Sequence, residues 1–185
     1  MLHQITPDTH GVLLDLHYAD DRNFTGRPVY GRAACYLRPE AEALLRRAVD
    51  LAAQLDLRLK VFDAFRPAEA QWVLWNHTPD PEFLADPRRG SPHSMGVAVD
   101  VTLVDAGGTD LDMGTPFDAF TPRSHHGSTE VSVAAQRNRH LLLGIMSAAG
   151  WDFYRAEWWH YQMFEARRHF PVLSDSVLPE PMMPG

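Results

Sequence analysis

The chain has 185 residues, of which 45% are hydrophobic and 22% charged, and its formal net charge at pH 7 is −7. That length suits one domain with a sizeable core, and the negative charge argues against a surface that binds nucleic acid or an anionic membrane. The only cysteine, Cys35, excludes an internal disulfide and is interpreted as a small buried apolar residue. We therefore expect a single domain over residues 1–185, with an irregular, proline-rich tail over 170–185.

The segment from Met1 to Asp8 has no basic patch followed by an apolar run, so no secretory signal is predicted. No stretch is long and apolar enough to span a membrane. A free thiol suits a reducing compartment. Together these features predict a cytoplasmic protein.

The first half of the chain contains two predicted helices and one predicted strand. Proline suits the first position of a helix, and an apolar stripe then recurs at helical spacing, so residues 39–55 are predicted to be helical. The stripe consists of Leu44, Leu45, Ala48, Leu51, Ala52 and Leu55. Alternating apolar and basic residues predict a strand over 57–65. A short helix is expected over 67–75, and residues 77–90, rich in Pro, Asp and Arg, are expected to form a loop.

The second half begins with a run of β-branched residues over 97–104 that predicts a buried strand, and Gly96 lets the backbone turn sharply into it. Residues 105–108 read as a turn. A second long helix is predicted over 130–149 and ends at Gly150 in a left-handed cap. A second strand-like segment contains Trp158, Trp159, Tyr161 and Phe164. Because helices and strands do not alternate regularly, we expect an α+β fold with an antiparallel sheet flanked by helices.

Two short segments hold the residue types of a catalytic zinc site. His93 lies seven residues before Asp100, and His160 lies three residues after Glu157. Catalytic zinc commonly has three protein ligands and an open position for water, and a nearby glutamate can act as the base. Each histidine alone is more often a core or surface residue; the joint pattern favours the metal site. A regular strand would put Glu157 and His160 on opposite faces, so both can face a metal only if the strand is bulged or begins between them.

The pattern Ser-x-His-x-x-Gly-x-Ala-x-Asp over 91–100, followed by Glu-x-Trp-His over 157–160, resembles the zinc D,D-peptidases. It is most similar to the VanX-type D-alanyl-D-alanine dipeptidases, and the resemblance extends from Asp15 to about Phe164. Further matching stretches are residues 18–19, 23–26, 63–67, 113–118 and 123–126.

The resemblance implies a fold shared with hedgehog-like domains, one zinc ion per chain, and hydrolysis of the small molecule D-alanyl-D-alanine to two D-alanine. It also implies roles for eight residues: His93, Asp100 and His160 as zinc ligands, Glu157 as general base, Arg66 as stabiliser of the transition-state oxyanion, and Tyr18, Ser91 and Asp118 at the ends of the dipeptide. A carboxylate suits the ammonium of a dipeptide, and a hydroxyl suits its carboxylate. Pro92 stands where a small polar residue is expected, which leaves the ligands intact but stiffens the loop.

Other interpretations of the same residues stay open at this point. Arg66 could form a surface ion pair with Asp63, and Asp118 could serve only in a turn. His125 and His126 could support the site or replace a ligand. A related murein D,D- or L,D-carboxypeptidase or endopeptidase that acts on longer cell-wall peptides is an alternative. A non-catalytic zinc domain on the same scaffold is a weaker alternative, because Glu157 and Arg66 are both present. The dipeptidase could serve cell-wall recycling or protection from glycopeptide antibiotics.

Overall fold

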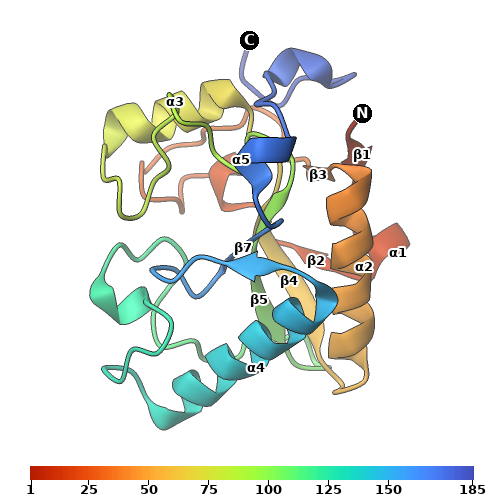
Figure 1. Ribbon diagram of the computed structural model, residues 1–185, viewed down its shortest axis with the longest axis vertical. Coiled ribbons are helices and arrows are strands. Elements are labelled where there is room, and N and C mark those ends of the chain that lie inside the picture. Colours follow the sequence, from red (N-terminus) through yellow and green to blue (C-terminus); the bar gives the residue numbers. More distant parts are fainter.

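A mixed sheet of five strands forms the centre of the computed structural model, which describes all 185 residues. The strand order is β2-β4-β5-β7-β6 (Figure 1). In that order the strands are Leu13–Leu14, Arg58–Asp63, Ala98–Val104, His160–Gln162 and Asp152–Phe153. All neighbours are antiparallel except β2 and β4, which pair in parallel, so the predicted antiparallel sheet is in fact mixed. A separate antiparallel pair joins β1 (His3–Gln4) and β3 (Tyr36–Leu37).

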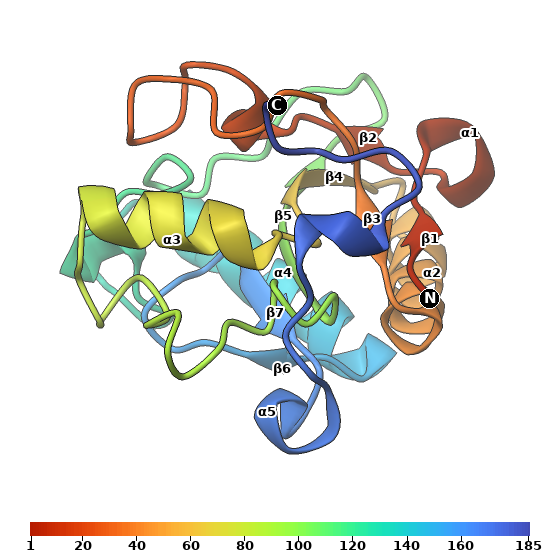
Figure 2. The same ribbon diagram turned by 90° about the horizontal axis from the view of Figure 1, so that it is seen from above.

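Helices lie on both sides of these strands, which confirms the predicted α+β class. The helix α2 (Pro39–Ala53) runs along one side, and α3 (Ala68–His77) lies on the opposite side in both ribbon views (Figures 1 and 2). The helix α4 (Val133–Ala149) packs against α2 and against β5 and β6. Two single-turn helices, α1 (Pro7–His10) and α5 (Ala166–His169), lie near the ends of the chain. None of the helices is long and apolar enough to cross a membrane.

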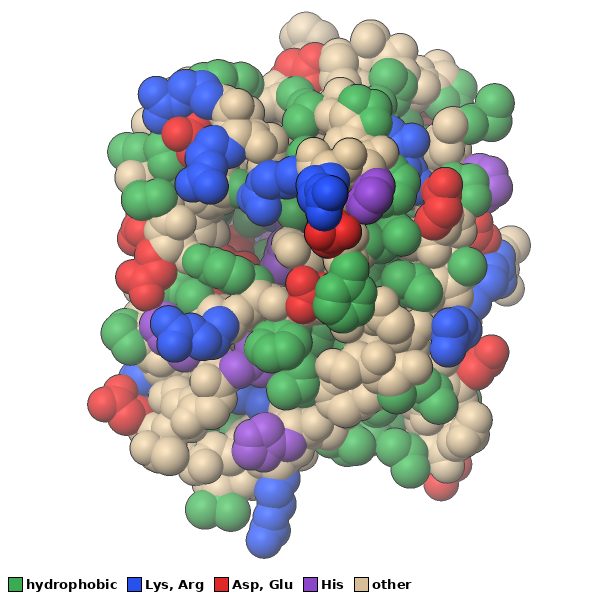
Figure 3. Space-filling model, in the orientation of Figure 1, with side chains coloured by type: hydrophobic (Ala, Val, Ile, Leu, Met, Phe, Trp, Pro, Cys, Tyr) green, Lys and Arg blue, Asp and Glu red, His purple; other side chains and the backbone are tan.

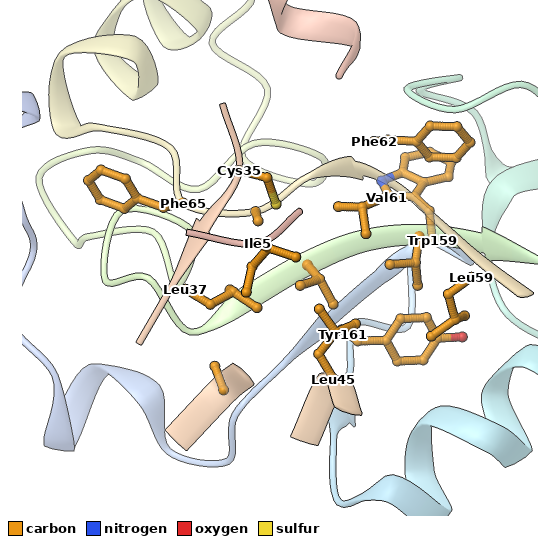
Figure 4. Packing of buried hydrophobic residues seen from close by; sticks show 14 of the residues in the cluster. Ile5, Cys35, Leu37, Leu45, Leu59, Val61, Phe62, Phe65, Trp159 and Tyr161 are labelled. Atoms are coloured by element: carbon orange, nitrogen blue, oxygen red, sulfur yellow. The ribbon is translucent and has the colours of Figure 1, made fainter. Parts of the chain in front are cut away.

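The core contains alternate side chains of the first half of β4 and every side chain of β5. Leu59 and Val61 are buried, while Arg58 on the other face is exposed. All seven residues of β5 are buried, as expected for a central strand covered on both faces. Figure 4 shows Leu45 of α2 close to Tyr161 of β7 within this core. Cys35 is buried as predicted, and burial raises the pKa of its thiol, so it is a poor nucleophile.

The element bounds differ from the predicted ones at the ends. Leu55 is 52% exposed because α2 ends at Ala53 and the chain turns away through Asp56, whose φ is 55°. The helix predicted over 130–149 begins at Val133, where the Ser132 side chain accepts from the N–H of Ala135. Gly150 has φ 106° and caps this helix in the left-handed conformation, as predicted. The strand predicted over 57–65 is Arg58–Asp63, and the helix predicted over 67–75 is Ala68–His77.

The C-terminal tail over 170–185 is irregular apart from a 3₁₀ turn at Asp175–Val177, yet it is firmly packed. Met182 is buried, and its carbonyl oxygen accepts hydrogen bonds from the N–H groups of Gly31 and Arg32. The Asp175 carboxylate accepts from the N–H of Met182 at 2.8 Å. The tail therefore covers the loop that leads into β3.

Candidate active site

The antiparallel pairing of β5 with β7 brings together two of the predicted metal ligands. In this register Asp100 lies directly opposite His160. His93 comes from the loop before β5, where Gly96 turns the backbone with φ 73° and donates its N–H to the His93 carbonyl at 2.9 Å. A Cβ at Gly96 would lie 2.7 Å from the Leu2 side chain, which would have to shift, and the positive φ strains any residue that has a side chain. The turn at Gly96 thus brings the His93 side chain next to Asp100 of β5.

The three candidate ligand atoms form a nearly equilateral triangle. His93 Nε2 lies 3.1 Å from His160 Nδ1, and each of these nitrogens lies 3.2 Å from Asp100 Oδ1. Tetrahedral zinc with bonds of about 2.0–2.1 Å separates its ligand atoms by roughly 3.3 Å. The triangle therefore has the dimensions of three corners of such a site, and all three residues are buried.

Hydrogen bonds on the far side of each imidazole determine which nitrogen carries its proton. His93 Nδ1 donates to the Ala64 carbonyl at 2.7 Å, and His160 Nε2 donates to Gln162 Oε1 at 3.1 Å. In the neutral rings the inner nitrogens then carry only lone pairs. Burial lowers the pKa of His160 despite the neighbouring Asp100, which favours the neutral ring. Three electron-pair donors thus face one point, and a cation there would relieve their mutual repulsion.

Glu157 lies beside this triangle because β7 begins only at His160. The strand-like segment predicted from Trp158 is shorter than expected, and Glu157 lies in a turn in which its N–H bonds to the Tyr154 carbonyl. Because Glu157 precedes the strand, it is not forced onto the strand face opposite His160. Glu157 Oε2 lies 3.9 Å from His160 Nδ1. Burial, reinforced by the charges of Asp100 and Asp118, raises the pKa of Glu157 well above its usual range.

Arg66 is held by several groups at the end of β4. Its Nε donates to Asp63 Oδ2 at 2.8 Å, its Nη1 donates to Gln71 Oε1 at 2.9 Å, and its Nη2 lies 3.4 Å from Asp100 Oδ2. Its guanidinium also lies 4.8 Å from the centre of the Tyr18 ring. The ion pair with Asp63 therefore exists, but it is buried and not on the surface. The ion pair orients Arg66, and the guanidinium also lines a cavity beside the triangle of His93, Asp100 and His160.

The three residues predicted at the ends of a dipeptide line the same cavity, which has a volume of about 270 Å³. Tyr18 donates its hydroxyl to Asp118 Oδ2 at 2.8 Å. Burial and the charge of Asp100 raise the pKa of Asp118 to about 8. The Ser91 hydroxyl accepts from the N–H of His93 at 3.3 Å, which leaves its own proton free to donate. Figure 3 shows Lys and Arg side chains close above a recess in which histidine and acidic side chains are visible.

His125 and His126 stay outside the triangle and the cavity lining. His125 lies 3.3 Å from a Glu82 oxygen, and the His126 ring packs edge-on against Phe153. Neither residue replaces a ligand in this arrangement.

Sequence reasoning missed several residues of the site. The composition of the predicted loop over 77–90 indicates no functional role, yet residues 81–86 and Arg89 line the cavity. The cavity is also lined by Tyr154, Gln162 and Arg167. Gln71 contacts Arg66 although it lies outside the lining. Its position five residues after Arg66, on the first turn of the helix that follows Pro67, is the only signal in the sequence that points to it.

Comparison with known proteins gives consistent results over most of the chain. Residues 1–176 match the model of the peptidase M15 family described as D-ala-D-ala dipeptidase. A D-alanyl-D-alanine dipeptidase of Escherichia coli K12 is 41% identical over 162 residues, which cover 88% of this chain and 83% of the relative. A protein of the same name from Enterococcus faecalis is 34% identical, over 84% of this chain and 88% of the relative.

Proposed function

This chain belongs to the D-ala-D-ala dipeptidase family of M15 peptidases, and we propose that it is a zinc-dependent enzyme that hydrolyses D-alanyl-D-alanine to two molecules of D-alanine. The observation that carries the proposal is the triangle of His93, Asp100 and His160 at 3.1–3.2 Å. Glu157 and Arg66 line the same cavity. The presence of both residues favours an enzyme over a non-catalytic zinc domain.

In the proposed site, His93, Asp100 and His160 hold the zinc. Zinc supplies Lewis acidity, which can lower the pKa of a water molecule to about 7. Two neutral imidazoles and one carboxylate leave a divalent cation with a net charge near +1, so the metal stays electrophilic. The hydrogen bonds to Ala64 and Gln162 keep both rings oriented with their lone pairs inward.

Glu157 is proposed to take a proton from the attacking water and then to deliver it to the leaving amine. Its carboxyl group borders the cavity, next to His160, and has no protein hydrogen-bond partner that would occupy it. A buried carboxyl group with a raised pKa is suited to both halves of this transfer. Such proton transfer typically contributes a rate factor of about a hundred to ten thousand.

Arg66 is proposed to stabilise the negative charge that develops on the carbonyl oxygen of the scissile bond. Its Nε and Nη1 are bound to Asp63 and Gln71 at 2.8 and 2.9 Å, whereas Nη2 makes only a longer contact with Asp100 at 3.4 Å and is the nitrogen best able to donate to a substrate. A donor aimed at a developing oxyanion in a buried site often contributes about 3 kcal/mol.

Asp118, Tyr18 and Ser91 are proposed to hold the two charged ends of the substrate. The Asp118 carboxyl group, bonded to Tyr18, would accept the free ammonium, and the Ser91 hydroxyl would donate to the carboxylate. The preference for D-alanine over L-alanine rests on family membership.

The small cavity favours a dipeptide over the longer peptides that murein carboxypeptidases trim. Its volume of about 270 Å³ is just below the range of about 300–1,000 Å³ common for ligand sites. Residues 81–86 border it as well, which reduces the room for a longer peptide. We further propose that residues 1–185 act as one domain in the cytoplasm, on dipeptide from cell-wall metabolism.

The test is a comparison of kcat/KM for D-alanyl-D-alanine, its N-acetyl form and a stem pentapeptide. We expect the dipeptide to be preferred by several orders of magnitude, because an acetylated amine leaves the buried Asp118 without a cationic partner. Comparable rates on all three substrates would favour the murein carboxypeptidase instead.

A further inference from the structure

Gln71 joins two parts of the site without lining the cavity itself. The side chain is 1% exposed and extends from the first turn of α3. Its Oε1 accepts a hydrogen bond from Arg66 Nη1 at 2.9 Å, and its Nε2 donates to the Ala85 carbonyl at 2.7 Å. Arg66 and Ala85 both line the cavity. One buried amide therefore connects the proposed oxyanion-stabilising arginine to the loop over 78–90.

Two anchors determine the plane of the Arg66 guanidinium. Asp63 accepts from Nε, and Gln71 accepts from Nη1 on another edge of the group. Without Gln71, the Asp63 bond and the longer contact of Nη2 with Asp100 at 3.4 Å would leave the planar group more room to tilt. Stabilisation of a transition state depends on donors that are already oriented before the reaction, so loss of the second anchor matters even when the charge remains.

The loop over 78–90 is likewise held from two sides. Gln71 holds it at Ala85, and Tyr154 donates its hydroxyl to the Glu82 carbonyl at 2.7 Å. Tyr154 is 39% exposed, whereas Gln71 is buried, so the Gln71 bond is better shielded from competing water. The Gln71 side chain thus contributes both to the orientation of Arg66 and to the placement of the loop.

We propose that Gln71 is a positioning residue for the reaction: it acts through Arg66 and ties the orientation of the guanidinium to the loop that borders the substrate. The inference rests on the proposed role of Arg66 in D-alanyl-D-alanine hydrolysis.

The first test is the variant Gln71→Met, which keeps the length of the side chain and removes both hydrogen bonds. We expect kcat to fall roughly ten- to a hundredfold, the range for loss of a hydrogen bond to a charged group, with KM changed much less. Zinc content and the melting temperature of the zinc-loaded enzyme are measured alongside. Gln136→Met is the matched control, because Gln136 also donates to a backbone carbonyl, that of Val131, far from the cavity lining. The control should keep the wild-type kcat.

The deciding measurement repeats Gln71→Met in the Arg66→Ala background. If Gln71 acts through Arg66, the second substitution should change kcat by less than about twofold once the arginine is absent. An equal loss of kcat in both backgrounds would mean a general structural role and would overturn the inference. If Gln71→Met fails to fold, Gln71→Asn supplies the same cycle, since its shorter amide cannot span both contacts.

Gln71→Glu separates the two hydrogen bonds. The carboxylate can still accept from Arg66 but can no longer donate to Ala85. We expect it to regain most of the kcat lost in Gln71→Met, while its KM stays close to that of Gln71→Met because neither variant can donate to Ala85. A kcat as low as that of Gln71→Met would contradict the proposal. Absence of wild-type hydrolysis would overturn the proposed function and the inference with it, whereas an Arg66→Ala variant with unchanged kcat would overturn the role of Arg66 and the inference but not the proposed function. Additive losses would overturn the inference alone.

Discussion

His93 Nε2 and His160 Nδ1 face each other at 3.1 Å, while each ring donates the proton of its other nitrogen to a protein oxygen. Two neutral imidazoles in these tautomers have no proton to share across the contact, and Asp100 Oδ1 adds a third acceptor at 3.2 Å from both. Such an arrangement is stable when a cation occupies the common point.

The first prediction concerns the metal. The purified protein should contain about one zinc per chain, and chelation should abolish hydrolysis until zinc is restored. His93→Ala and His160→Ala should lose metal and activity together, because each removes one corner of the site. Metal analysis and melting temperature with and without zinc check this, since binding to the folded state alone raises stability. Full activity in metal-free protein would rule it out.

The variant Glu157→Ala tests whether Glu157 acts as a general base or as a zinc ligand. Because Glu157 lies beside the triangle and not in it, the variant should keep its zinc while kcat falls by about a hundred- to ten-thousandfold. Metal analysis and steady-state kinetics on the same preparation provide the comparison. Loss of zinc in this variant would instead make Glu157 a ligand.

Arg66→Ala should keep zinc and lower kcat by about a hundredfold or more, with a smaller rise in KM, as expected for a contact made mainly in the transition state. The variant also leaves Asp63 without its ion-pair partner, so stability should fall as well. Zinc-saturated protein well below its melting temperature is therefore used for the kinetics. A rise in KM with unchanged kcat would assign Arg66 to ground-state binding.

Asp118→Ala should narrow the difference in kcat/KM between D-alanyl-D-alanine and its N-acetyl form. The wild-type enzyme penalises the acetylated substrate because the buried Asp118 loses an ammonium partner, and the variant has no carboxyl group to leave unpaired. Tyr18→Phe is the companion variant, since it removes the hydroxyl that bonds to Asp118 but keeps the ring under Arg66. An unchanged ratio in Asp118→Ala would show that the ammonium binds elsewhere.

The pH dependence of stability should contain a contribution from Glu42 on α2. Although burial opposes the effect, hydrogen bonds from His3, Arg46 and His10 hold the pKa of Glu42 at about 2, below its ordinary 4.5. A depressed carboxyl pKa stabilises the fold above the unfolded value, and this contribution is lost as pH falls from about 4.5 through about 2. The free energy of unfolding in urea should therefore fall less steeply with acid in Glu42→Gln. Glu40→Gln, on the same helix but without an ion pair, should follow the wild type.

Local sequence was sufficient for the main elements. The stripe of α2 predicts a helix because residues three and four apart share a face, and the β-branched run predicts β5 because such side chains suit a buried strand. The identity and spacing of His93, Asp100, Glu157 and His160 predict ligands and a base, since few residue types bind zinc. These properties depend on neighbours in the chain, so the chain alone determined them.

Other features depend on contacts between distant segments. The start of β7 at His160 follows from its pairing with β5, and this start is what places Glu157 beside the metal triangle. Tyr18 meets Asp118 from 100 positions away, and Gln71 reaches both Arg66 and Ala85. No periodicity along the chain encodes these pairings, because they arise only when burial of the core aligns the strands and brings the loop over 78–90 against the cavity. The sequence by itself thus determined the helices, the central strand and the chemical inventory of the site, whereas tertiary packing decided which of those groups share a cavity and how each is oriented.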